Sequence, residues 1–111
     1  MTLHHAPSGE IIDIRPYGEK LKQEIARTLV KAPLLQVFRY VLLAGKEFAD
    51  HKVSGGITVQ CLEGVVLFTA HEKTQILRPG QLVFVAAGVP HALKGVEDAS
   101  VLVTIVARKN A

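Results

Sequence analysis

The sequence predicts an all-β fold, an antiparallel barrel or sandwich made of short strands. Two observations support this prediction. From residue 34 onward the chain is a series of short runs rich in β-branched and aromatic residues, and Gly- or Pro-containing turn signals recur every six to twelve residues. The length of 111 residues is that of one domain, and it allows a core without disulfides or a metal.

The N-terminal part of the chain carries the weakest structural signal. Residues 1–8 are polar and predict a flexible tail, followed by a single domain over residues 9–111. Within that domain, residues 10–14 read Glu-Ile-Ile-Asp-Ile, which is typical of a short strand, and Arg-Pro then ends it.

A short amphipathic helix is the one departure expected from the all-β pattern. Leu21, Ile25 and Leu29 recur every four residues among Lys and Glu, which indicates one apolar helix face. The helix cannot continue past Pro33. Residues 28–30 are β-branched or aliphatic, so an extended conformation there is the alternative.

The remaining runs predict strands joined by tight turns. These strand candidates cover residues 34–42, 57–62, 65–70, 73–77, 82–86, 91–94 and 101–107. Glu63-Gly64 predicts a hairpin turn, and residues 78–80 read Arg-Pro-Gly, which favours a turn with Pro at its first corner. The polar pair Glu97-Asp98 separates the last two strands.

The charge balance does not favour a nucleic-acid partner. Thirteen Lys and Arg against ten Asp and Glu give a formal net charge of +3. The cationic residues are spread from Arg15 to Lys109 with no run longer than two. A nucleic-acid-binding surface needs a basic cluster or stripe, so we expect no such partner.

The cysteine content and the apolar runs indicate the compartment. Cys61 is the one cysteine, lies within an apolar run and offers no disulfide framework, which suits a reducing environment. The first residues lack the apolar segment of a secretory signal, and no run approaches membrane-spanning length. We therefore expect a cytoplasmic protein without membrane contact.

The glycines and histidines of the second half follow a more specific pattern. Residues 45–64 resemble the first motif of the cupin superfamily, and residues 80–95 resemble the second. The matching positions are Gly45, His51, Gly64, Gly80, Gly88 and His91. The chain is therefore similar to small single-domain microbial cupins, and this resemblance implies an antiparallel jelly roll of six to eight strands.

The resemblance also exposes a degenerate set of metal ligands. Metal-binding cupins usually present three His and one Glu inside the barrel. His51 matches the first His and His91 the last, but Val53 occupies the second His position and Ile57 the Glu position. A functional metal site normally has three or four protein ligands. The resemblance thus implies weak binding of a divalent transition metal by the incomplete set of His51 and His91, with an atypical metal site as the alternative.

We expect the two histidines to share one pocket. His51 and His91 fall at motif positions whose side chains converge in related proteins. Without a metal, these imidazoles can bind a small polar molecule or act as a general acid and base.

Two further residues are candidates for the same pocket. Phe48 belongs to a loop that should border the pocket mouth. Gln60 faces the pocket if the strand face of Thr58 and Gln60 points inward. The alternative inner face holds Ile57 and Cys61, and strand parity beside a bulge leaves both possibilities open.

Three functions remain open at this stage. The leading hypothesis is a module that binds a small polar metabolite in the barrel. The first alternative is an enzyme, either a metal-dependent oxygenase or isomerase or a metal-free acid/base catalyst. The second is a structural or partner-binding barrel whose vestigial site is filled by its own apolar side chains. We also expect a homodimer, formed when the apolar strand of residues 11–14 pairs with the sheet edge of a partner.

Overall fold

The computed structural model describes residues 5–51 and 54–106 of the chain. Within these ranges nearly all regular structure is antiparallel strand, and no helix is long and apolar enough to cross a membrane. The elements are η1 (Gly18–Gln23), β1 (Arg27–Lys31), β2 (Leu35–Leu42), β3 (Glu47–His51), β4 (Ile57–Ala70), β5 (Lys73–Leu77), β6 (Leu82–Val85) and β7 (His91–Val106).

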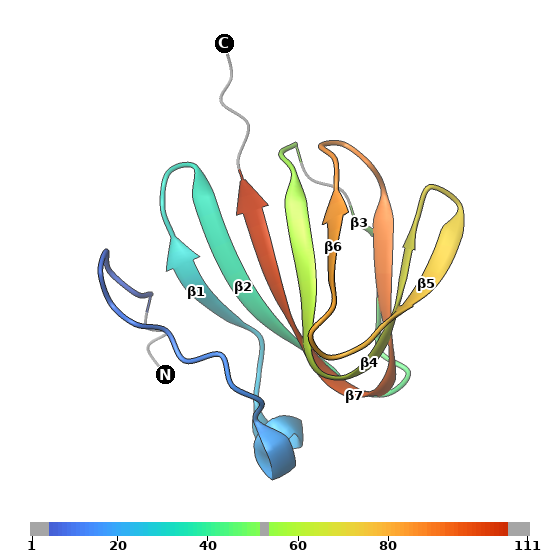
Figure 1. Cartoon of the computed structure of the whole chain (residues 1–111), viewed down its shortest axis with the longest axis horizontal. Coiled ribbons are helices and arrows are strands. Elements are labelled where there is room, and N and C mark those ends of the chain that lie inside the picture. Colours follow the sequence, from blue (N-terminus) through green and yellow to red (C-terminus); the bar gives the residue numbers. More distant parts are fainter. Residues whose placement is uncertain (1–4, 52–53, 107–111) are drawn as a thin grey trace.

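The strands form two layers because β4 and β7 are long enough to belong to both (Figure 1). One layer has the strand order β1, β2, β7, β4, β6, with β1 and β6 at its two edges. In this layer the second half of β7 lies between β2 and the first half of β4. In the other layer β3 pairs with the first half of β7, and β5 with the second half of β4. The jelly roll predicted from the sequence is confirmed.

The core lies between the two layers. Alternate residues of a strand point to opposite faces of the sheet. On β4 the buried set is Ile57, Val59 and Cys61, whereas Thr58 and Gln60 between them are only partly buried. The inner face of β4 is therefore the apolar one.

The strand predicted at residues 10–14 is wrong. This segment has no strand, and the Ile11 side chain is 92% exposed. Ile12 and Ile14 are only partly buried, so their alternation contributes little packing. Pairing of this segment with the sheet edge of a partner stays a prediction.

The predicted helix is shorter than the apolar spacing indicated. The 3-10 helix η1 ends at Gln23, and only Leu21 of the predicted apolar face is buried in it. Ile25 is exposed in the connection that follows, and Leu29 lies on β1. The extended alternative for residues 28–30 is confirmed, because β-branched Thr28 and Val30 pair with β2.

The hairpin turn predicted at Glu63-Gly64 is also wrong. β4 continues through both residues, and its register with β7 shifts between Cys61 and Val66. Gly64 has a φ of +77°, and a Cβ there would overlap the backbone of Asp98 and its neighbour. Gly64 is thus required by a bulge. Likewise, β7 continues through Glu97-Asp98 as one strand where two were predicted.

A buried polar cluster fastens the N-terminal segment to the outside of the barrel. The Arg39 guanidinium donates hydrogen bonds to the Arg15 carbonyl (2.9 Å), the Glu63 carboxylate (3.1 Å) and the Ser100 hydroxyl (3.0 Å). Glu63 also accepts from the Ser100 hydroxyl at 2.6 Å and from the backbone N–H groups of Tyr17 and the next residue. The cluster holds residues 15–18 against the sheet.

Candidate ligand-binding site

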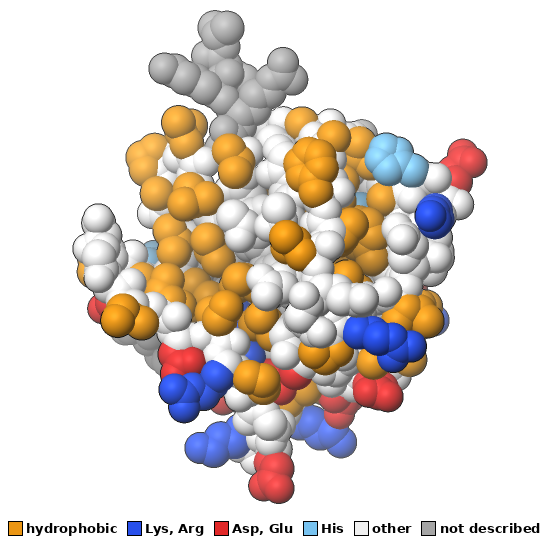
Figure 2. All heavy atoms as spheres, in the orientation of Figure 1, with side chains coloured by type: hydrophobic (Ala, Val, Ile, Leu, Met, Phe, Trp, Pro, Cys, Tyr) orange, Lys and Arg blue, Asp and Glu red, His pale blue; other side chains and the backbone are white. Residues whose placement is uncertain are grey.

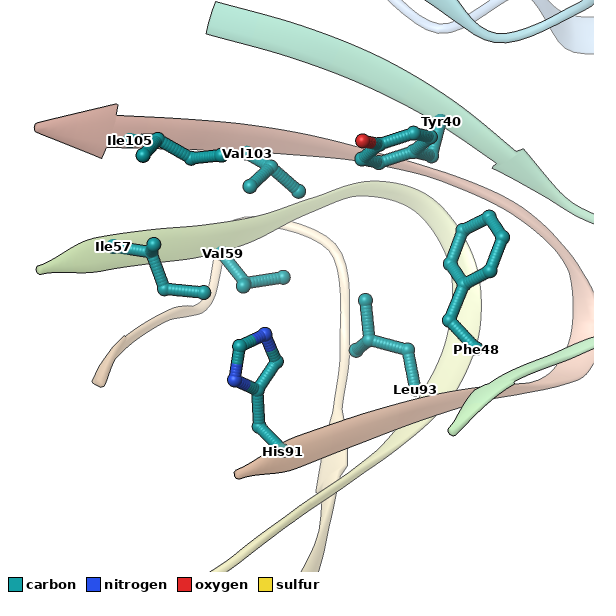
Figure 3. A pocket seen from close by; sticks show the side chains of 8 residues that line it. All are labelled: Tyr40, Phe48, Ile57, Val59, His91, Leu93, Val103 and Ile105. Carbon is teal, nitrogen blue, oxygen red and sulfur yellow. The ribbon is translucent and has the colours of Figure 1, made fainter. Parts of the chain in front are cut away.

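A cavity of about 300 Å³ lies between the two layers, on the inner face of the sheet. Four strands supply its walls, and Figure 3 shows their side chains converging on one space. The lining residues are Tyr40, Phe48, Ile57, Val59, His91, Leu93, Val103 and Ile105.

Strand alternation explains why these residues share the cavity. Ile57 and Val59 on β4, and Val103 and Ile105 on β7, are two residues apart and therefore point to the same face. The pairing of β4 with β7 sets Val59 opposite Val103 and Ile57 opposite Ile105. These four side chains form one continuous aliphatic wall.

His91 is the polar feature of the opposite wall. It is buried at the start of β7, and its ring stacks on Phe68 with centroids 6.3 Å apart. Its Nδ1 lies 3.1 Å from the Val89 carbonyl oxygen, which can only accept a hydrogen bond. Nδ1 therefore carries a proton, and in the neutral ring Nε2 is the acceptor. Figure 3 shows the ring projecting into the cavity.

Two aromatic side chains line the open end of the cavity. The Tyr40 and Phe48 rings are 5.1 Å apart and inclined at 68°, an edge-to-face arrangement. Phe48 is 42% exposed and so lies at the opening. Burial raises the pKa of Tyr40, so its hydroxyl stays protonated near neutral pH. None of the described lining residues is Lys, Arg, Asp or Glu.

The other candidates from the sequence are placed differently. The backbone of His51 on β3 pairs with that of His91 on β7, so the two positions lie opposite one another; the His51 side chain lies outside the described part of the structure. Val53 also lies outside the described residues. Gln60 does not line the cavity, because the inner face of β4 is that of Ile57 and Val59.

The donor set does not fit a three-His, one-Glu metal centre. Ile57, at the position of the Glu ligand, contributes an aliphatic side chain to the cavity wall. Burial raises the pKa of the Cys61 thiol, which keeps it in the protonated form that does not bind metal. Among the described residues, no group of three or more His, Cys, Asp or Glu could hold an ion.

Sequence reasoning missed Tyr40 and Leu93 as lining residues. Leu93 is two residues beyond His91 on a predicted strand, so alternation was a usable signal for it. For Tyr40 the signal was weaker, because the strand of residues 34–42 has apolar residues on both faces. Only the pairing of Tyr40 with Val101 reveals which face is inner.

Comparison with known proteins identifies the family. Residues 38–107, more than half of the chain, match the family model of the cupin domain. This chain belongs to the cupin family. No curated protein matches this cupin.

Solved structures extend the likeness over nearly the whole chain. A conserved protein of unknown function from Streptococcus pyogenes is 27% identical, with 99% of this cupin and 98% of that chain covered and a TM-score of 0.76. A cupin superfamily protein from Desulfitobacterium hafniense is 15% identical, with 97% and 100% covered and a TM-score of 0.77.

One similar structure is that of an enzyme. The salicylate 1,2-dioxygenase from Pseudoaminobacter salicylatoxidans, solved as adducts with gentisate, is 23% identical, with a TM-score of 0.68. The match covers 73% of this cupin and 24% of the dioxygenase chain. At 23% identity for the dioxygenase and 15% for the Desulfitobacterium hafniense protein, the likeness shows the shared fold alone. The activity of this cupin is uncertain.

Proposed function

We propose that this cupin is a binding module that holds a small organic molecule in the cavity, with His91 as its polar contact. The observation that carries this proposal is a largely apolar cavity of about 300 Å³ with one imidazole on its wall. A cavity of this volume is within the range that small ligands occupy. A vestigial site filled by its own side chains would leave no such space.

We include His51 and Phe48 in the proposed site. The pairing of the His51 and His91 backbones supports a shared pocket, and the exposed part of Phe48 supports a position at the mouth. Gln60 is left out because it does not line the cavity. The lining is also less polar than a strongly polar metabolite requires, so the proposed ligand carries few polar groups.

The proposal is tested with paired variants. We would measure thermal shifts with a set of alcohols, phenols, ketones and carboxylic acids of about 6–12 heavy atoms, the size this cavity can enclose. The His51→Ala, His91→Ala double variant should stay folded and lose the shifts seen with the native protein. His71→Ala, which changes an exposed histidine, should keep them.

A second variant guards against a fold defect in the first. Val103→Trp places bulk in the cavity while leaving both histidines in place, and it should also abolish the shifts. Shifts that persist in both the double variant and Val103→Trp would show that the compounds bind elsewhere, which would contradict the proposal.

We propose that the site works without a resident metal, because its donors do not match the cupin metal set. Protein purified without a His tag should contain substoichiometric Fe, Mn, Ni and Zn, and adding these ions should not raise the melting temperature. One metal ion per chain together with a rise in melting temperature would instead support the metal-dependent alternative.

We also propose that two copies pair through the outer face of the layer that contains β6. Leu82 and Phe84 are 60% and 69% exposed there, and Leu35 and Val106 add exposed apolar surface on paired strands. Figure 2 shows uncharged side chains over much of this face and charged ones along its lower and right margins. The uncharged part of this face can pack against the same part of a second copy across a two-fold axis, which favours a second copy as the occupant.

The size of the face limits the strength of such a pairing. Five strands about 4.8 Å apart and about 20 Å long give at most about 500 Å² per copy, and residues 15–18 cover part of it at Arg39. Two copies would bury at most about 1,000 Å², which is near the lower limit for a specific interface. Cys61 is a free, buried cysteine, and a cysteine outside any disulfide supports the reducing cytoplasm that the sequence predicts.

A further inference from the structure

The volume of the cavity limits the ligand to one or two rings. An engineered apolar cavity of about 150 Å³ binds benzene. The cavity beside His91 has about 300 Å³, twice that volume. It therefore has room for a single substituted ring or for two fused rings.

The described part of the cavity wall disfavours ligands with many polar groups. His91 and Tyr40 offer hydrogen bonds, and the other described lining residues are apolar. A polar group buried without a partner weakens binding by about five- to one-hundred-fold. Sugars, nucleotides and amino acids carry several such groups, whereas a molecule with one hydroxyl group can donate its hydrogen bond to His91.

The shape of the walls favours a flat molecule over a flexible one. Tyr40 and Phe48 meet edge to face, so together they present both a ring face and a ring edge to the cavity (Figure 3). The aliphatic wall that contains Val59 and Val103 is made of β-branched side chains, which are stiff. A planar ring contacts both walls and has no conformational freedom to lose, unlike an alkyl chain.

We infer that the ligand is a flat aromatic molecule of one or two rings with a single hydroxyl group. Its ring lies between the Tyr40 and Phe48 side chains and the aliphatic wall, and its oxygen bonds to His91. This inference rests on the proposed function and specifies the chemical class of the ligand. When the His91 ring is neutral, its Nε2 accepts the hydrogen bond from a hydroxyl group.

Three matched probes separate the features of this ligand. 2-Naphthol has the flat rings and the hydroxyl, naphthalene lacks the hydroxyl, and decahydro-2-naphthol keeps the hydroxyl on a saturated, non-planar skeleton. The chain has no Trp, so naphthyl fluorescence reports binding of the first two directly. Decahydro-2-naphthol is measured by displacement of 2-naphthol.

The native protein should bind 2-naphthol more tightly than either analogue. An aromatic pair is worth about two- to twelve-fold in affinity, and we expect a preference of that size over decahydro-2-naphthol. Phe48→Leu should reduce this preference, whereas Phe84→Leu, the same change on the outer face, should leave it intact. His91→Leu should bring 2-naphthol and naphthalene to equal affinity.

The outcomes distinguish this inference from the proposed function. Equal or tighter binding of decahydro-2-naphthol, with binding still dependent on His91, would overturn the aromatic ligand and leave the binding module standing. The aromatic ligand would also be overturned if 2-naphthol failed to bind while aliphatic compounds gave thermal shifts that the double histidine variant loses. The binding module would then still stand. Binding of 2-naphthol that survives Val103→Trp would contradict both proposals.

Discussion

Individual residues in this cupin divide between those that shape the cavity and those that hold the barrel together. Ile57 contributes an aliphatic side chain at the position of the Glu ligand, and His91 adds an imidazole to the opposite wall of the cavity. On the outside, Glu63 and Arg39 form a buried ion pair whose hydrogen bonds also reach the N-terminal segment. The inside of the sheet is therefore suited to a neutral ligand, and the charged chemistry lies on the other face.

Glu63 should make the stability of the protein depend on pH in the acid range. Burial raises the pKa of Glu63, but hydrogen bonds from Ser100, Tyr17 and Gly18 and the Arg39 charge outweigh it and lower the pKa below 4.5. Because the pKa is lower in the folded state, the stabilisation is complete above about pH 4.5 and is lost as the pH falls below it.

Glu63→Gln tests this pH dependence. The variant should be less stable than the native protein at pH 7, and its stability should change less between pH 5 and pH 3, as measured by urea unfolding. Glu97→Gln, at an exposed position on β7, is the matched control. If the free energy of unfolding of Glu63→Gln fell with pH in parallel with that of the native protein between pH 5 and pH 3, Glu63 would not be the group that makes stability depend on pH.

At the scale of the elements, the long strands β4 and β7 determine the architecture. Both pass from one layer into the other, and the register between them shifts where they do so. Gly64 lies at this point with a positive φ and with the Asp98 backbone against its Cα. The bulge thus lets one pair of strands serve two layers and enclose the cavity.

Gly64→Ala should destabilise the protein strongly. We expect a loss of about 3 kcal/mol or more, because the left-handed backbone and the overlap with Asp98 act together. Gly80→Ala is the matched control: Gly80 also has a positive φ, of +87°, but no atom within 4 Å of an added Cβ. It should lose about 1 kcal/mol. Similar losses for both variants in urea unfolding would show that the close contact at Gly64 is unimportant.

The sequence predicts most strands of this cupin but not how they are joined. The predicted bounds of β2, β5 and β6 agree with the structure within about a residue, because Pro or Gly lies close to at least one end of each strand. Gly64 was misread because a positive φ serves a hairpin turn and a bulge equally well. The inner face of β4 could not be chosen either, since its parity beside a bulge depends on pairing with β7.

At the scale of the whole molecule, the two motifs contribute residues to one cavity, and other strands supply most of its apolar wall. Phe48 and His91 line one cavity, as expected for residues of the two motifs. The apolar character of that cavity depends on Tyr40 and Val103, from strands outside both motifs. The buried ion pair of Arg39 and Glu63 likewise joins distant segments, so local patterns carry no signal for it.

Self-association should occur through the outer face that carries Phe84. Light scattering after size exclusion should show a dimer at micromolar concentration, and Phe84→Glu should convert it to a monomer because two carboxylates would face an apolar surface. Ile76→Glu changes an equally apolar, exposed residue on β5 in the other layer and should leave the dimer intact. A native protein that stays monomeric at micromolar concentration would contradict this interface.

The most direct test of a metal-free ligand site is a crystal structure of the untagged protein soaked with 2-naphthol, with anomalous data collected at metal absorption edges. We predict naphthol density between the aromatic end and the aliphatic wall, with its oxygen within hydrogen-bonding distance of His91 Nε2, and no anomalous peak in the cavity. An anomalous peak at His91, or naphthol bound only outside the cavity, would contradict this prediction.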